Sequence, residues 1–260
     1  MNAEADFNTP GILLRRVEYG DNDLILNVIT PDRGKMVLMA KAAKRSRRRF
    51  GGVLDLFAIL DLSCRGSRRG RMTLLAEASL CESLNSLRTE VAKTAYASYW
   101  VELVHFWGEE GQPQPDLYAL LYDVLMALDR DRLPARVLSL LFQLHFMNLA
   151  GLGPRLSACV GCRCPIGGLG DLQFGLDAAR GGVICQRCDP KPRLTVSRGA
   201  LKELAWIAAG GLARAQRMRF SSEALCAGEE MMESFIPIHL GREVRSLKFL
   251  RHLRESGALA

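Results

Sequence analysis

Four cysteines in two closely spaced pairs are the residues of this sequence best suited to chemistry. Cys159 and Cys162 are separated by two residues, as are Cys185 and Cys188, and 22 residues lie between the pairs. Thiolates at this spacing can bind a zinc ion tetrahedrally, and four protein ligands leave no coordination position open for a substrate. The pattern therefore predicts one structural Zn²⁺ per chain. The alternatives are reduced thiols or a site that has lost its metal.

Cys164 is a fifth thiol in the same segment and competes as a ligand. We favour the pair 159/162, because a spacing of two residues forms a metal-binding knuckle whereas 162/164 would be cramped. No histidine with a nearby glutamate accompanies the cysteines, as it does in zinc deaminases and hydrolases. The site is therefore interpreted as structural rather than catalytic.

A dense basic run is the second constellation. The nine residues from Lys41 to Arg49 hold six positive charges and no acid, and more cations follow in neighbouring turns. Such side chains neutralise phosphates in a salt-dependent, largely sequence-independent way. We expect several of these loops to converge on one rim and bind nucleic acid, the alternative being a solvated basic loop. The predicted contact residues are Arg33, Lys35, Lys41, Lys44, Arg45, Arg47, Arg48, Arg49, Arg68, Arg69 and Arg71.

The composition sets bounds on these hypotheses. The chain has 260 residues, 48% of them hydrophobic and 24% charged. These are globular proportions that exclude wholesale disorder and a small disulfide scaffold. The net charge of +7 favours a polyanionic partner. The positive charge lies at the two ends, with 14 basic and 9 acidic side chains in residues 1–80 and 12 against 7 in residues 190–260.

The compartment follows from the termini and the apolar runs. The first ten residues include two acids and no apolar stretch, so we expect no secretory signal. The uncharged stretch 137–153 is interrupted by polar residues and predicts a buried helix rather than a membrane span. We therefore expect a cytoplasmic protein whose cysteines stay reduced or bind metal.

The elements that must position these residues change character near residue 80. Residues 11–80 contain five short apolar segments separated by turn-forming residues, with alternation clearest at 24–28 and 54–62. Five strands of this kind predict an OB-fold barrel, although an SH3-like barrel would show the same pattern. Beyond residue 83 the period is helical. The first predicted helix ends near residue 107, and two more follow at 117–128 and 134–150. After the cysteine-bearing segment, three further helices are predicted at about 198–209, 221–239 and 241–255.

These elements predict an α+β multidomain protein. Residues 1–80 would form a five-stranded OB-fold β-barrel that binds nucleic acid, and residues 81–260 an α-helical domain with an inserted four-cysteine zinc module at about 157–192. The C-terminal segment 241–254 adds a basic face, which we interpret as the solvated side of a packed helix. A groove for an acidic partner peptide is the alternative. No phosphate-binding loop, nucleophile elbow or H-E-x-x-H motif is present, so we predict no catalytic activity.

Several stretches of the sequence resemble the RecO family of bacterial recombination mediators. They are GILLRRVEYGDNDLILNVITPDRGKMVLMAKAAKRSRRRFGGVLDLF at 11–57, GLGPRLSACVGC at 151–162, GGVICQRC at 181–188 and LGREVRSLKFL at 240–250. The order and spacing of these landmarks carry the likeness, which covers nearly the whole chain. Arg163 stands where such knuckles often have glycine.

The resemblance implies an OB-fold, a helical domain and a zinc module in the members that keep the cysteines. It also implies a role in recombinational DNA repair by the RecF pathway, in the cytoplasm at the nucleoid. A member would bind single- and double-stranded DNA, anneal complementary strands and, with RecR, help load RecA onto strands coated by single-stranded-DNA-binding protein (SSB). Two other hypotheses remain: a zinc-stabilised adaptor that docks proteins without a direct DNA function, and an unrecognised enzyme.

Overall fold

The chain divides into two compact units in the computed structural model, which describes residues 5–66 and 72–257. Unit 1 is Met1–Asp129 and unit 2 is Arg130–Ala260. A closed five-stranded barrel comes first and helices follow, so the predicted fold class is confirmed. The domain boundary at residue 80 stays a prediction.

The barrel has the strand order β1-β2-β3-β5-β4, and β1 closes it by pairing with both β2 and β4. All pairs are antiparallel except β3 with β5. This five-stranded closed order is that of an OB-fold. The strands are β1 (Phe7–Tyr19), β2 (Asp23–Thr30), β3 (Gly34–Ala40), β4 (Ile59–Arg65) and β5 (Thr73–Glu82).

The barrel interior follows the alternation seen in the sequence. Leu24, Leu26 and Val28 are all buried in the barrel core, as their spacing predicts. The fourth strand is shorter than predicted, because it begins at Ile59 instead of near residue 52. Phe57 breaks the extended backbone with φ 70°, and its N–H donates to Leu13 O at 3.1 Å. The apolar residues before the strand therefore form turns.

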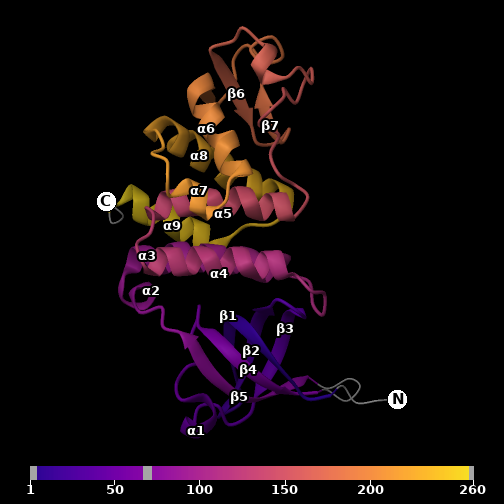
Figure 1. Ribbon diagram of the computed structural model, residues 1–260, viewed down its shortest axis with the longest axis vertical. Coiled ribbons are helices and arrows are strands. Elements are labelled where there is room, and N and C mark those ends of the chain that lie inside the picture. Colours follow the sequence, from indigo (N-terminus) through magenta and orange to yellow (C-terminus); the bar gives the residue numbers. More distant parts are fainter. Residues whose placement is uncertain (1–4, 67–71, 258–260) are drawn as a thin grey trace. The chain divides into compact units, whose positions relative to one another are not determined.

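Short and long helices cover the two ends of the barrel in unit 1 (Figure 1). At one end lies α1 (Arg47–Phe50), whose Phe50 is 1% exposed and belongs to the barrel core. The sequence pattern did not predict this helix. At the other end lie α3 (Val91–Trp107) and α4 (Pro115–Asp129), with α2 (Ser86–Thr89) before them. Helix α4 starts at Pro115, two residues before the predicted start at 117, because proline suits the first helical position.

Unit 2 contains the remaining helices and a small sheet. The helices match the predicted ranges within about four residues, apart from the unpredicted short α7. The three-stranded sheet, in the order β7-β6-β8, was also not predicted, because its strands have only three to five residues. The elements are α5 (Ala135–Leu149), η1 (Ile166–Gly168), β6 (Gln173–Asp177), β7 (Gly182–Ile184), β8 (Thr195–Ser197), α6 (Arg198–Ala209), α7 (Leu212–Ala215), α8 (Ser222–Leu240) and α9 (Arg245–Glu255).

Two buried glutamates on α8 join the helices of unit 2. Glu229 accepts two hydrogen bonds from Arg136 on α5, at 2.9 and 2.7 Å. Glu233 pairs with Arg251 at 2.7 Å and with Arg254, both on α9. Part of the basic face of α9 is therefore occupied within the unit, as expected for a packed helix.

Replacement of Glu233 by alanine should lower the free energy of unfolding of unit 2. We expect a decrease of about 2 kcal/mol, because the guanidinium groups of Arg251 and Arg254 lose their partner, a glutamate that is 8% exposed. The loss is not larger because Arg251 is partly solvated. Hydrogen exchange of the α8 and α9 amides would measure the loss. Glu230→Ala, on an exposed position of the same helix, is the control. Equal protection in the two variants would contradict the prediction.

Candidate nucleic-acid interface and metal centre

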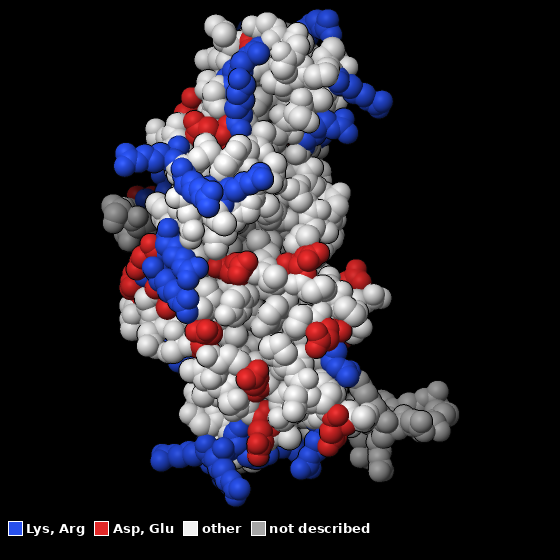
Figure 2. Space-filling model, viewed as in Figure 1, with Lys and Arg blue, Asp and Glu red and all other residues white. Residues whose placement is uncertain are grey.

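The basic run lies at the end of the barrel that carries α1, where Figure 2 shows Lys and Arg side chains gathered. Lys41, Arg45, Arg47 and Arg48 are exposed there. In the part of the chain that the structure describes, none of these four side chains has an ion pair. Their charges are therefore available to a polyanion.

The β1–β2 turn fixes the first half of this loop. Asp23 Oδ1 accepts from the N–H of Ala42 at 2.7 Å, and Asn22 O accepts from the N–H of Lys44 at 3.1 Å. The ammonium of Lys44 lies 2.8 Å from a carboxylate oxygen of Glu18 and lowers the pKa of that carboxyl. Lys44 is thus partly neutralised within the protein, whereas its neighbours are not.

Arg49 closes the loop and lines a groove. Its guanidinium donates to Lys41 O at 2.6 Å and to Ser46 Oγ at 3.0 Å. A groove of about 270 Å³ beside β3 and β5 is lined by Lys41, Arg49 and Arg65, with Glu77 among its other residues. Arg65, at the end of β4, was not among the predicted contacts.

The outer face of β1, β2 and β3 adds an apolar surface beside these cations. Val17, Ile25 and Met39 lie opposite one another across the three strands and are only half-buried. Tyr19 ends β1 opposite Asp23 on the same face and is 55% exposed. Sequence reasoning missed Tyr19, because Arg16 and Glu18, which alternate with it along β1, are themselves charged and exposed and so mark no buried face in the sequence.

The two rings that the sequence placed near the basic run do not contribute to a binding surface. Phe50 is 1% exposed and Phe57 is 5% exposed. Both rings belong to the buried core.

Two of the predicted contacts lie at the opposite end of the barrel. The guanidinium of Arg33 stacks over the Phe7 ring at 3.6 Å, and Lys35 Nζ donates to His105 O at 3.2 Å. Strand β3 runs from Gly34 to Ala40, so its length separates Lys35 from Lys41. Arg33 and Lys35 are therefore not on the rim that carries the basic loop, and their contact with nucleic acid stays a prediction. Arg68, Arg69 and Arg71 lie outside the described residues.

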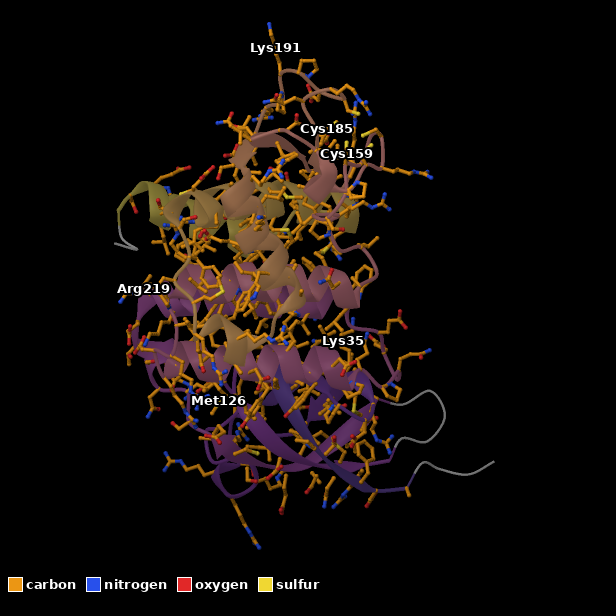
Figure 3. The ribbon with its side chains drawn as sticks, turned by 45° about the horizontal axis from the view of Figure 1, so that its top comes forward. Lys35, Met126, Cys159, Cys185, Lys191 and Arg219 are labelled. Carbon is orange, nitrogen blue, oxygen red and sulfur yellow. The ribbon has the colours of Figure 1, made fainter. Side chains whose placement is uncertain are left out.

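The four predicted metal ligands come together in unit 2. The Sγ atoms of Cys159, Cys162, Cys185 and Cys188 all lie within 4.8 Å of one another. The two knuckles face each other, as Cys159 and Cys185 show in Figure 3. The fifth thiol, Cys164, lies outside this set. The spacing of the cysteines therefore brings these four sulfur atoms into one cluster, and their role as metal ligands stays a prediction.

The backbone explains how each knuckle forms. The N–H of Arg163 donates to Cys159 O at 2.9 Å, and the N–H of Cys188 donates to Cys185 O at 3.0 Å. Arg163 adopts the left-handed conformation at φ 63°, which favours glycine, so an arginine there is strained. A Cβ on Gly161 would lie 3.0 Å from Cys188 Sγ, which explains the glycine at that position.

The electrostatics of the cluster oppose the simultaneous ionisation of its thiols. Hydrogen bonds from the N–H and thiol of Cys164 lower the pKa of Cys162 to about 6. The pKa of Cys188 is raised to about 12, chiefly by its hydrogen bond with Cys185. A divalent cation removes this conflict because it stabilises all the thiolates at once. The sulfur donor set therefore fits a tetrahedral metal ion such as Zn²⁺.

Comparison with known proteins decides the family. The model for "Recombination protein O N terminal" matches residues 1–84, and the model for "Recombination protein O C terminal" matches residues 88–248. The chain belongs to the RecO family. Proteins named DNA repair protein RecO from Desulfatibacillum aliphaticivorans and Desulfosudis oleivorans are each 40% identical to it, over 95% of this chain and 96% and 98% of their own lengths. A namesake from Anaeromyxobacter sp. strain K is 36% identical over 92% of this chain.

Membership of the RecO family confirms the resemblance seen in the sequence. It supports a role in DNA repair and recombination, with DNA and the recombination machinery as partners. Among the described residues, no helix has the length and apolar character needed to cross a lipid bilayer.

Proposed function

We propose that this RecO-family protein is a non-catalytic mediator of the RecF pathway that acts in the cytoplasm at the nucleoid. It binds single- and double-stranded DNA at the α1 end of the barrel and anneals complementary strands. With RecR, it helps to load RecA onto strands coated by SSB. The observation that carries the proposal is the cluster of Lys41, Arg45, Arg47 and Arg48, exposed and without ion pairs among the described residues, on a loop fixed to the barrel.

The annealing step is physical. Two complementary strands repel each other through their phosphates, and guanidinium and ammonium groups beside both backbones screen that repulsion. The hydrogen bonds that the N–H groups of Ala42 and Lys44 donate to Asp23 and Asn22 hold part of the loop before DNA arrives, so less conformational freedom is lost on binding. Mainly electrostatic contacts of this kind do not select a sequence.

We further propose that Cys159, Cys162, Cys185 and Cys188 hold one structural Zn²⁺ per chain. When bound, the ion joins the two knuckles and neutralises their thiolates. Its four protein ligands leave no position for a substrate, so the metal contributes folding energy and no chemistry.

Tyr19 should contribute to the binding of single strands more than of duplexes. Its exposed ring can stack on an unpaired base, which is worth about 1–3 kcal/mol per base. Tyr19→Ala should therefore weaken oligothymidylate binding by about tenfold. Duplex binding should be unchanged, and Tyr19→Phe should retain the wild-type affinity. Parallel fluorescence-anisotropy titrations measure both affinities, and equal losses for the two DNA forms would contradict stacking.

The proposed function is tested by binding to labelled single-stranded DNA across a salt series, with annealing of a complementary strand followed in the same samples. We expect steep salt dependence together with accelerated annealing. Absence of binding at low salt would overturn the proposal and favour a zinc-stabilised protein that docks other proteins. Metal-stimulated cleavage of the DNA would indicate an enzyme instead.

A further inference from the structure

A second cationic surface lies in unit 2, on the segment that joins α6 to α8. Arg214, Arg217 and Arg219 stand within six residues, and all three are exposed. The 19 residues from 204 to 222 contain no Asp or Glu. Figure 2 shows Lys and Arg side chains on the face where α6 and α7 lie, and Arg219 projects from the surface in Figure 3. The segment therefore presents positive charge alone.

The carboxylates that bound this segment accept hydrogen bonds from serine residues. Glu203 accepts from the N–H and hydroxyl of Ser221 at 2.8 and 3.1 Å. Glu223 accepts from the N–H and hydroxyl of Ser197, both at 2.7 Å. Within the described ranges, none of the three arginines takes part in an ion pair. Their charges are not used to hold unit 2 together.

The backbone keeps these arginines ordered. The N–H of Arg217 donates to Arg214 O at 3.0 Å, so the turn of α7 continues and places the two residues on one side. Ala215 between them is 1% exposed and anchors the turn. A Cβ at Gly210 would lie 3.5 Å from Arg214 Cβ, which shows that this arginine packs against the glycine.

Two aromatic rings adjoin the cations in sequence. Trp206 on α6 and Phe220 are both half-buried, with ring centroids 6.3 Å apart and planes inclined by 50°. Cations that bind phosphates, beside rings that stack on bases, are the combination that binds single-stranded nucleic acid. An acidic peptide would use the cations but would have no need of the rings.

We propose that Arg214, Arg217 and Arg219, together with Trp206 and Phe220, form a second surface that binds single-stranded nucleic acid. This second surface is additional to the barrel interface, so each unit would bind a nucleic-acid strand of its own. Annealing requires two strands on one protein, and two separate surfaces meet that requirement without both strands sharing the loop at 41–48. A strand bound at this surface should quench Trp206.

The test uses the full-length chain and oligothymidylate. In a protein that carries Arg47→Glu and Arg48→Glu, residual binding should persist and quench tryptophan fluorescence. The quenching should disappear in Trp206→Phe. Adding Arg214→Glu, Arg217→Glu and Arg219→Glu should weaken that residual binding by at least about tenfold and lower the salt slope by about 2, from three lost phosphate contacts.

The matched control reverses three other exposed cations of unit 2, with Arg155→Glu, Lys191→Glu and Arg193→Glu. An equal loss in the control, or no residual binding once the barrel arginines are reversed, overturns the second surface. So does equal quenching by polyglutamate, which would identify an acidic polypeptide as the ligand. If the barrel substitutions have no effect while the unit 2 substitutions abolish binding, the second surface stands and the barrel assignment fails.

Discussion

Replacement of Cys185 by serine should remove the metal and unfold most of unit 2 while leaving the barrel intact. The expected metal content is about one zinc per chain in the wild type and close to none in the variant. Cys185 is 1% exposed and directly follows the three-residue strand β7, so the loss reaches the small sheet. Structural zinc contributes about 10–16 kcal/mol of apparent binding energy to small modules, which is comparable to or greater than the total stability of a typical domain.

Elemental analysis of the freshly purified protein and hydrogen exchange resolved by unit would measure these effects. Cys164→Ser is the matched control, because its thiol lies in the same segment but outside the four-sulfur set. It should keep the metal and the protection of unit 2. A wild-type protein without metal, or a Cys164 variant that loses as much as the Cys185 variant, would contradict the assignment of the ligands.

Reversal of two barrel charges, Arg47→Glu with Arg48→Glu, should weaken DNA binding and flatten its dependence on salt. Each lost phosphate contact lowers the slope of log K against log [salt] by about 0.7 for single strands and 0.9 for duplexes. The slopes should therefore fall by about 1.4 and 1.8, and affinity at about 0.1 M salt should fall by about 10- to 100-fold. Folding should be unaffected, because both side chains are exposed and α1 is anchored by Phe50.

Two further variants separate position from charge. Arg47→Lys with Arg48→Lys preserves both charges and should retain most of the affinity and the full salt slope. Lys191→Glu with Arg193→Glu changes the net charge by the same amount as the barrel variant, but at exposed positions in unit 2. An unchanged affinity in the folded barrel variant would move the interface elsewhere.

Most of the correct predictions came from the spacing of residues close together in the sequence. The alternation of Leu24, Leu26 and Val28 marked a strand whose inner face is buried, and the spacing of the cysteines marked the knuckles. Both patterns extend over only a few residues, so they can be recognised in the sequence without knowledge of the tertiary structure. The long helices were recovered for the same reason.

The missed features depend on contacts between distant residues. Helix α1 has only four residues and depends on Phe50, which is buried in the barrel core. The turn at Phe57 depends on a backbone hydrogen bond to Leu13. Lys35 lies away from the basic loop because the length of β3 separates it from Lys41. Tyr19 differs from Phe50 and Phe57 in that its ring is exposed in the folded protein. No local pattern encodes these relations.

The way in which the barrel closes has a consequence for its synthesis. Among the described residues, β3 and β5 pair through two residue pairs, Leu38 with Thr73 and Met39 with Leu74, whereas β1, β2 and β3 pair in succession along the chain. Contacts between residues far apart in sequence form late, because a long loop must first be closed. As the chain leaves the ribosome, the three-stranded meander can therefore form first, with its last edge unpaired. Until residues 73–82 emerge, that edge is open to pairing with other strands, and nascent chains are then most exposed to aggregation.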